Sequence, residues 1–361
     1  MTPWISSEFP TGNGLISQVG TYEFVVDRDL RDSTGDRWYW HVRLHAERDA
    51  LVRIRLARPL LIGQFGPVVS RAGTRDWLWA SPGPDTAFDV PLPGRTTVGL
   101  SATMAYGLQE LEAFRAKLGE SVVWQSLTGS EGGSDVPVII VPHPKAENLV
   151  LLTARHHACE AMASYVLEGA VQEFIELRRA RDPSVSRCEL MAAPIMDMDG
   201  VTRGDQGKAR KPWDHNRDYG VSSTYRSVSA LRNRLAADGR NTYALDLHTP
   251  GLRGPMEEVS YVVSSGDPGD YETAQGFLGT FNSLHGGCDF KAPEVLLFDH
   301  DWNSASSLSQ RCCSAWLRSR KDTRIALTIE YPNAVVQGVP VTEYRARMFG
   351  ALLLRTLIAQ M

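Results

Sequence analysis

A histidine and a glutamate stand three residues apart directly after an apolar run in the middle of the chain. The run Leu151–Ala154 leads to His157 and Glu160. If both side chains lie on a first helical turn, this spacing places the imidazole and the carboxylate on one face, close enough to share a metal ion. A single H-x-x-E is a weak signal, because simple pairing on a helix surface explains most such matches. Further ligands are needed before the pair predicts a metal site.

Two later apolar segments also end in residues of this kind. Tyr243–Leu247 is followed by His248, and Arg324–Ile329 is followed by Glu330. His248 alone would more often be an ordinary loop or core residue, but a carboxylate after a strand with no polar face needs a partner. Two imidazoles, one carboxylate and an open position for water form a catalytic zinc arrangement, in which a further glutamate takes a proton from the water. The sequence therefore predicts one Zn²⁺ per chain, held by both histidines and the first glutamate, with Glu330 as general base.

These motifs resemble, in type and order, those of the zinc metallocarboxypeptidases, and most of all the branch of the cytosolic carboxypeptidases and their bacterial relatives. The matching segments are His157-x-x-Glu160, Asp199-Gly-Val, Asp214-His-Asn-Arg217, Asp246-Leu-His248 and Glu330-Tyr-Pro. The resemblance covers about residues 103–361, and the preceding segment also looks like the N-terminal domain of that branch. It implies a zinc peptidase that acts at the C-terminus of its substrate.

The resemblance also implies roles for residues around the metal. Asp214 would accept a hydrogen bond from the first zinc histidine, and Asn216 and Arg217 would hold the terminal carboxylate of the substrate. The arginine that many members use to polarise the scissile carbonyl is replaced by glycine here, about ten residues before Arg217. Lys208 or Arg210 could take its place as a substrate-binding cation, or this basic loop is merely solvated. The tyrosine that the family carries on a mobile flap has no clear match.

The elements that must position these residues follow from hydrophobic patterning. From about residue 103 to 361, strand-like runs alternate with helical ones, which predicts an α/β domain with a mixed, largely parallel sheet flanked by helices. Such a sheet places its sites at the carboxyl ends of the strands. Residues 1–102 read as short alternating strands separated by Gly, Pro and Asp, which predicts a preceding β-sandwich domain.

Bulk composition excludes several classes of partner. A net charge of −4 over 361 residues leaves no basic excess for nucleic acid or an anionic membrane surface. No apolar run approaches the ~20 residues of a membrane span. The first Lys or Arg is Arg28, so a cationic signal region is not expected at the N-terminus. Five cysteines without a C-x-x-C pair indicate reduced thiols. We therefore expect a soluble cytoplasmic protein.

Three functions fit these motifs. The resemblance favours hydrolysis of the C-terminal peptide or isopeptide bond of a peptide with a free carboxylate. The same zinc site could serve an amidase or deacylase that acts on N-acyl amino acids or another small amide. A binding protein that kept the fold and lost turnover is the third alternative. Glu330 argues against it, because a pseudoenzyme would be expected to lose its base first.

Overall fold

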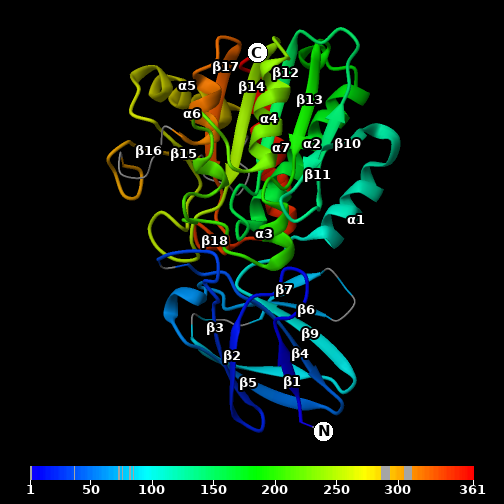
Figure 1. Ribbon diagram of the computed structural model, residues 1–361, viewed down its shortest axis with the longest axis vertical. Helices are drawn as coiled ribbons and strands as arrows, with labels where there is room; N and C mark the ends of the chain where they lie inside the picture. Colours follow the sequence, from blue (N-terminus) through cyan, green and yellow to red (C-terminus); the bar gives the residue numbers. More distant parts are fainter. Residues whose placement is uncertain are drawn as a thin grey trace.

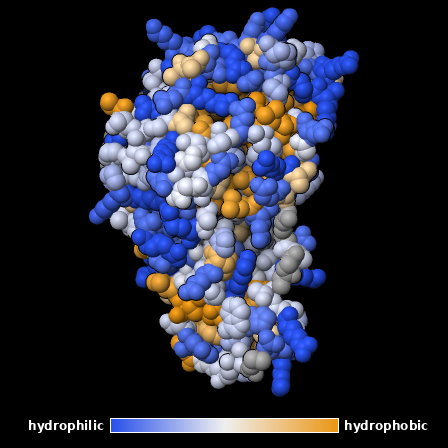
Figure 2. Space-filling view, turned by 45° about the vertical axis from the view of Figure 1, so that its right-hand side comes forward, coloured by the Kyte–Doolittle hydropathy of each residue, from blue (hydrophilic) through white to orange (hydrophobic). Residues whose placement is uncertain are grey.

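The chain forms two parts, each built around its own sheets. The computed structural model describes residues 2–35, 37–71, 74, 76–80, 83, 85–285, 293–304 and 311–361. A β part holds the N-terminus at the bottom of Figure 1, and a larger α/β part above it holds the C-terminus. Hydrophilic atoms cover most of the face seen in Figure 2, and hydrophobic atoms gather in a few patches. Within the described ranges, no helix has the length and apolar character to cross a membrane.

Two sheets pack together in the N-terminal part, which we call the β-domain. Its strands are β1 (Trp4–Ser6), β2 (Leu15–Gly20), β3 (Glu23–Asp27), β4 (His41–Ala46), β5 (Ala50–Leu56), β6 (Val68–Arg71), β7 (Trp77–Trp79), β8 (Ala87–Leu92) and β9 (Thr96–Ser101). They pair in the orders β1-β4-β9-β6-β7 and β2-β3-β5-β8. Val52 and Ile54 of one sheet share a buried cluster with Val42 and Leu44 of the other. The alternating pattern thus yields the predicted sandwich, because one face of each sheet is apolar.

The larger part is built on an eight-stranded mixed sheet. Its strands are β10 (Val123–Gly129), β11 (Asp135–Val141), β12 (Asn148–Ala154), β13 (Cys188–Ala193), β14 (Asn241–His248), β15 (Tyr261–Val263), β16 (Glu294–Leu296) and β17 (Thr323–Glu330). The order is β10-β11-β13-β12-β14-β17-β15-β16. The central strands β13, β12, β14 and β17 are parallel neighbours, whereas β10, β11 and β15 pair antiparallel. This confirms the predicted α/β fold with a mixed sheet.

Helices cover both faces of this sheet. They are α1 (Leu108–Leu118), α2 (Ala161–Arg179), α3 (Met198–Arg203), α4 (Arg226–Ala236), α5 (Pro268–Leu284), α6 (Cys313–Arg318) and α7 (Glu343–Ile358). Along β12, Leu149 and Leu151 pack in a cluster with α4 and α6. Val150 and Leu152 pack in another with α2, α5 and α7. Successive side chains of a strand point to opposite faces, so a strand buried on both sides is apolar throughout.

Helices α2 and α7 cross at very short distance, which fixes the helix that begins at the site. A Cβ on Gly169 would lie 1.9 Å from the carbonyl oxygen of Arg347, and one on Gly350 would lie 1.8 Å from that of Val166. Only glycine fits at both positions without movement of a helix backbone. Glu160 is the residue directly before α2. The close packing of α2 on α7 therefore helps to fix the position of the helix end that Glu160 precedes.

The cysteines agree with the expectation of reduced thiols where they are described. Cys159, Cys188, Cys312 and Cys313 are free. Cys288 lies outside the described ranges.

Candidate metal site and catalytic cleft

Two histidines point one ring nitrogen each at the same carboxylate. The Nδ1 of His157 lies 2.8 Å from Oε1 of Glu160, and the Nδ1 of His248 lies 2.7 Å from Oε2. All three side chains are buried, and their ligand atoms lie within 4.8 Å of one another. The spacing of His157 and Glu160 is compatible with a first helical turn, but the two residues do not lie on one. They lie in the loop before α2, after Arg155, where the backbone has a φ of 59°.

Each of these imidazoles has an aspartate at its other nitrogen. The Nε2 of His157 is 3.4 Å from Oδ1 of Asp214, and the Nε2 of His248 is 3.0 Å from Oδ2 of Asp246. A carboxylate holds the proton on Nε2, which leaves the Nδ1 lone pair for a metal ion. Burial would raise the pKa of Asp214, but the charges on His157 and then Arg217 hold it below its usual value. The arrangement of donors therefore fits a catalytic metal.

Asp246 ties a further buried histidine to this site. Its Oδ1 lies 2.9 Å from Nδ1 of His156 and accepts a hydrogen bond of 2.8 Å from the Thr153 hydroxyl. The Nε2 of His156 is 2.7 Å from the Tyr219 hydroxyl. His156, Asp246 and His248 also lie close enough to share an ion. We interpret them as the support of His248, since Asp246 already binds three groups. The i, i+2 spacing of Asp246 and His248 on β14 was the signal that could have identified this role.

Glu330 lies at the end of β17, beside His248 at the end of β14. The two residues are register partners in the parallel pair. Glu330 is 3% exposed, and its Oε2 has no hydrogen-bond partner among the described residues. Burial, and after it the negative charge of Glu160, raises the pKa of Glu330 to about 7. A carboxylate with such a pKa can both take and return a proton near neutral pH.

Glu160 and Glu330 line a cleft of about 470 Å³. Its lining includes Glu160, Lys208 and Glu330 from the α/β part, and Arg37, Trp38 and Leu60 from the β-domain. Two aromatic residues that the sequence did not single out also line it. Tyr261 is the register partner of Glu330 across β15 and β17, and its hydroxyl accepts a hydrogen bond of 3.2 Å from the indole of Trp302. No motif marks either residue.

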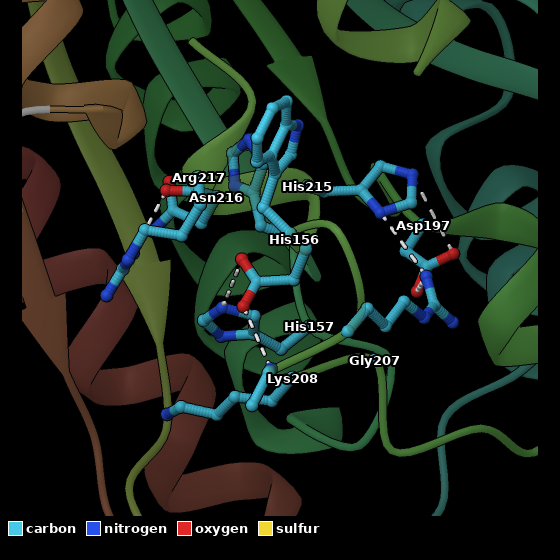
Figure 3. Close-up of polar contacts among 12 residues, drawn as sticks. His156, His157, Asp197, Gly207, Lys208, His215, Asn216 and Arg217 are labelled. Atoms are coloured by element: carbon cyan, nitrogen blue, oxygen red, sulfur yellow. Dashed lines mark hydrogen bonds and ion pairs between the residues drawn. The ribbon is translucent and has the colours of Figure 1, made fainter. Parts of the chain in front are cut away.

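Lys208 is the cation that lies next to the histidine and glutamate group. Its Nζ is 3.2 Å from Oε1 of Glu160, and Figure 3 shows its side chain beside His157. The preceding Gly207 has a φ of +74°, and a Cβ there would lie 2.1 Å from the backbone nitrogen of Ala158. No arginine side chain fits at position 207. The backbone at position 207 therefore admits only glycine, and Lys208 is the cation of this loop that lies next to Glu160.

Arg210 is engaged by three carboxylates away from the cleft. Its guanidinium lies 2.8 Å from Asp32, 2.7 Å from Asp197 and 2.9 Å from Asp205, and its side chain is 9% exposed. Burial alone would lower the pKa of Arg210, but Asp197 and Asp32 raise it above its usual value. In Figure 3, Asp197 lies well apart from Lys208. These ion pairs favour a structural role for Arg210, and its contact with a substrate stays an untested prediction.

We expect Arg210→Met to lower the free energy of unfolding by about 3 kcal/mol, because Asp32, Asp197 and Asp205 lose a shared cation in a place with little solvent, and Arg203 remains as a partner of Asp205. Urea unfolding measures the change. The control is Arg187→Met, which breaks an ion pair with Glu147 whose side chains are 65% and 54% exposed, and should cost under about 1 kcal/mol. Equal losses for the two variants would contradict a structural role for Arg210.

The segment after this loop brings Asp214, Asn216 and Arg217 to the site. Asn216 is buried in η4 (His215–Arg217), where its Oδ1 accepts a hydrogen bond of 2.9 Å from the Cys313 backbone. Its Nδ2 lies 2.9 Å from Nε2 of His248. The hydrogen bond from Cys313 uses the amide oxygen inside the protein, which favours a supporting role for Asn216. The half-buried Arg217 donates to the Asn216 carbonyl at 2.9 Å, and binding of a substrate carboxylate stays a prediction for it.

The comparisons with known proteins bear on the fold. No protein-family model matches the sequence, and no curated protein sequence matches it. Solved structures do. A metallo-carboxypeptidase from Burkholderia cenocepacia matches with a TM-score of 0.77 at 17% identity, over 99% of this chain and 98% of that one. A metallo-carboxypeptidase from Pseudomonas aeruginosa, in complex with (2-guanidinoethylmercapto)succinic acid, matches with a TM-score of 0.73 at 16% identity, over 99% and 98%. The chain therefore has the fold of the metallo-carboxypeptidases over nearly its whole length, β-domain included.

Proposed function

We propose that this protein is a zinc-dependent carboxypeptidase that hydrolyses the C-terminal peptide or isopeptide bond of its substrate. The observation that carries the proposal is the group formed by His157, Glu160 and His248 next to Glu330, whose Oε2 has no hydrogen-bond partner in the described part of the chain. Both imidazoles direct Nδ1 inward. The outer nitrogen of His248 is hydrogen-bonded to Asp246, and that of His157 lies 3.4 Å from Asp214. The fold of the metallo-carboxypeptidases supports the same reaction.

We assign a separate role in the reaction to each residue around the metal site. Zinc bound in such a site supplies a water of lowered pKa and a Lewis acid for the scissile carbonyl. Glu330 accepts a proton from the water that attacks the carbonyl carbon, and returns it to the nitrogen of the amine as the C–N bond breaks. Lys208 would place its positive charge near the oxygen that becomes negative. Asp214 and Asp246 would keep the histidines in the tautomer that binds the metal.

The substrate we propose is a peptide with a free terminal carboxylate. Arg217 is the cation that would hold it, since a guanidinium forms two parallel hydrogen bonds with a carboxylate and stays charged at any working pH. The relative from Pseudomonas aeruginosa is in complex with a substituted succinic acid, which is also a carboxylate. Turnover of N-acyl amino acids but not of peptides would instead favour the amidase or deacylase.

Metal content tests the proposal before any substrate is known. We expect about one zinc per chain in protein purified without chelator, because two histidines and one glutamate without thiolates form a catalytic site. His157→Ala and His248→Ala should each lose most of it. His143→Ala, on a histidine outside the site, should retain it. Elemental analysis of the four proteins gives the answer.

One further variant separates the two groups of residues that could hold an ion. His156→Ala should keep most of the zinc, because His156 belongs to the support of His248 and not to the ligand set. If His156→Ala lost zinc as completely as His157→Ala, the metal would lie on the His156, Asp246 and His248 group. Less than a tenth of an equivalent of zinc in the wild type, without uptake on titration, would rule out the zinc site.

A further inference from the structure

Three consecutive residues of the β-domain bind the backbone of the loop that carries Lys208. We call residues 204–210 the Lys208 loop. Asp32 accepts hydrogen bonds from two of its backbone N–H groups, with Oδ1 3.0 Å from the nitrogen of Gln206 and Oδ2 2.8 Å from that of Gly207. One carboxylate from the other domain thus fixes the two peptide groups directly before Lys208.

The next two residues of the β-domain bind the other side of the lysine. The Ser33 hydroxyl donates to the carbonyl oxygen of Lys208 itself. Thr34 donates to the carbonyl oxygen of Ala209 from both its backbone nitrogen at 3.4 Å and its hydroxyl at 3.1 Å. Backbone groups of four consecutive residues, 206–209, are therefore held by residues 32–34.

The metal-site side holds the same loop from the opposite direction. Gly207 packs against the backbone of Ala158, which leaves no room for a Cβ. The backbone nitrogen of Ala209 donates at 3.0 Å to Oδ2 of Asp214, whose Oδ1 faces His157. The Lys208 loop is thus clamped between the β-domain and the residues that orient the metal ligands.

This clamp matters because of the side chain that the loop carries. A lysine has a flexible four-carbon stem, so the position of its ammonium group depends on how firmly its backbone is fixed. The Nζ of Lys208 reaches Oε1 of Glu160 at 3.2 Å. Within the described residues, Asp32 is the β-domain carboxylate that binds this loop.

We propose that Asp32 is a positioning residue that fixes Lys208 in the cleft, so that the β-domain forms part of the active site. The inference rests on the proposed function, in which Lys208 stabilises the developing negative charge. Asp32 acts through the backbone of the Lys208 loop and does not touch the substrate. The proposed metal ligands and the base all lie in the α/β part. The β-domain would contribute to the reaction through Asp32.

A double-mutant cycle on the zinc-loaded full-length chain tests this coupling. Asp32→Asn keeps the size of the side chain but places an amide group against two backbone N–H donors, and it also weakens the ion pair with Arg210 of the same loop. We expect it to lower kcat/KM by about 10-fold to 100-fold, within the range that a ~1 Å misplacement of a catalytic group can cost. In a Lys208→Gln background, Asp32→Asn should lower kcat/KM by less than about twofold, because the charge it positions is gone. The same fold-loss in both backgrounds would overturn the proposal.

Asp29→Asn is the matched control. Its carboxylate accepts hydrogen bonds from Arg31 alone among the described residues, at 2.9 Å from the backbone nitrogen and 2.9 Å from Nε. The substitution changes the same β-domain segment by the same chemistry. It leaves in place the backbone carbonyl of Asp29, which accepts a hydrogen bond of 3.2 Å from the Gln206 side chain. We expect kcat/KM within about twofold of the wild type. A loss equal to that of Asp32→Asn would show a general effect of the segment and would overturn the assignment to Asp32.

Hydrogen exchange gives a second measurement that does not need turnover. Asp32→Asn should speed exchange of the amides in a peptide that spans residues 206–209, while Asp29→Asn should leave it unchanged. If Asp32→Asn does not fold, Ser33→Ala serves in its place, since it removes only the hydrogen bond to the Lys208 carbonyl. A wild type that cleaves no peptide would contradict the proposed function alone. Unchanged exchange in the loop of the variant would contradict the positioning role, whatever the wild type cleaves.

Discussion

Glu330→Gln is expected to lower kcat/KM by at least ~10²-fold while zinc content and the unfolding transition stay close to those of the wild type. The amide keeps the shape of the side chain but cannot take a proton from water, and a positioned general base contributes at least this factor. The change should fold well, because the carboxylate is buried with one oxygen unpartnered among the described residues. Kinetics on a C-terminally free peptide, with elemental analysis of the same sample, measures both effects.

The control and the contradictory outcome both concern the role of Glu330. Glu294→Gln changes an exposed glutamate of β16 in the same sheet and should leave kcat/KM within about twofold. If Glu330→Gln released the zinc as the histidine variants are expected to do, Glu330 would be a ligand and not a base. If it kept both zinc and activity, another group would have to move the proton.

The metal site is predictable from the sequence because its residues follow strands with no polar face. His157 and Glu160 come after β12, and His248 and Glu330 close β14 and β17. In parallel strands, residues at the carboxyl ends meet at one edge of the sheet. Apolar runs of strand length, each ending in a potential ligand, are therefore enough to expect that the four side chains converge. The register that pairs His248 with Glu330 comes from the structure.

The choice between Lys208 and Arg210 could not be made from the sequence. Both are cations of one short loop, and they differ only in what surrounds them. Arg210 is bound by Asp32, Asp197 and Asp205, and the first of these comes from the β-domain. A contact between residues 178 positions apart leaves no local pattern. The steric limit at Gly207 is likewise visible only once the loop packs on Ala158.

The cleft itself was also beyond the sequence. Tyr261 belongs to a strand of three residues, which is too short to show an alternating pattern in the sequence. Trp302 lies in a turn, where no periodic pattern is expected. Arg37 and Trp38 reach the cleft from the β-domain. Strands of the sandwich follow from their alternation, but which loops face the other domain depends on docking of the two parts. Side chains that line a surface between domains carry no periodic signal of their own.

Amidation of the C-terminus of a peptide substrate is expected to cost about 2–5 kcal/mol in kcat/KM with the wild type, because it removes one partner of a charged pair that is desolvated on binding. Arg217→Ala should lower turnover of the free peptide by a similar factor and largely erase the difference between free and amidated substrates. Arg217→Lys should recover only part of the loss, since an ammonium group cannot form the bidentate contact. Kinetics of the three proteins on the two substrates gives the cycle.

The contrast with Asn216 sharpens this test. Because its amide already binds the Cys313 backbone and lies 2.9 Å from His248, we attribute its effect to the metal site. Its removal, like that of His156, should leave most of the zinc bound and lower kcat/KM for the free and the amidated peptide alike, whereas Arg217→Ala should lose only the discrimination between carboxylate and amide. Arg324→Ala, on an exposed arginine near the far end of β17 from Glu330, is the matched control and should leave the discrimination intact. Equal turnover of free and amidated peptides by the wild type would refute action at a free C-terminus and favour the amidase. A site that does not bind the terminal carboxylate cannot distinguish the C-terminal bond from other amide bonds.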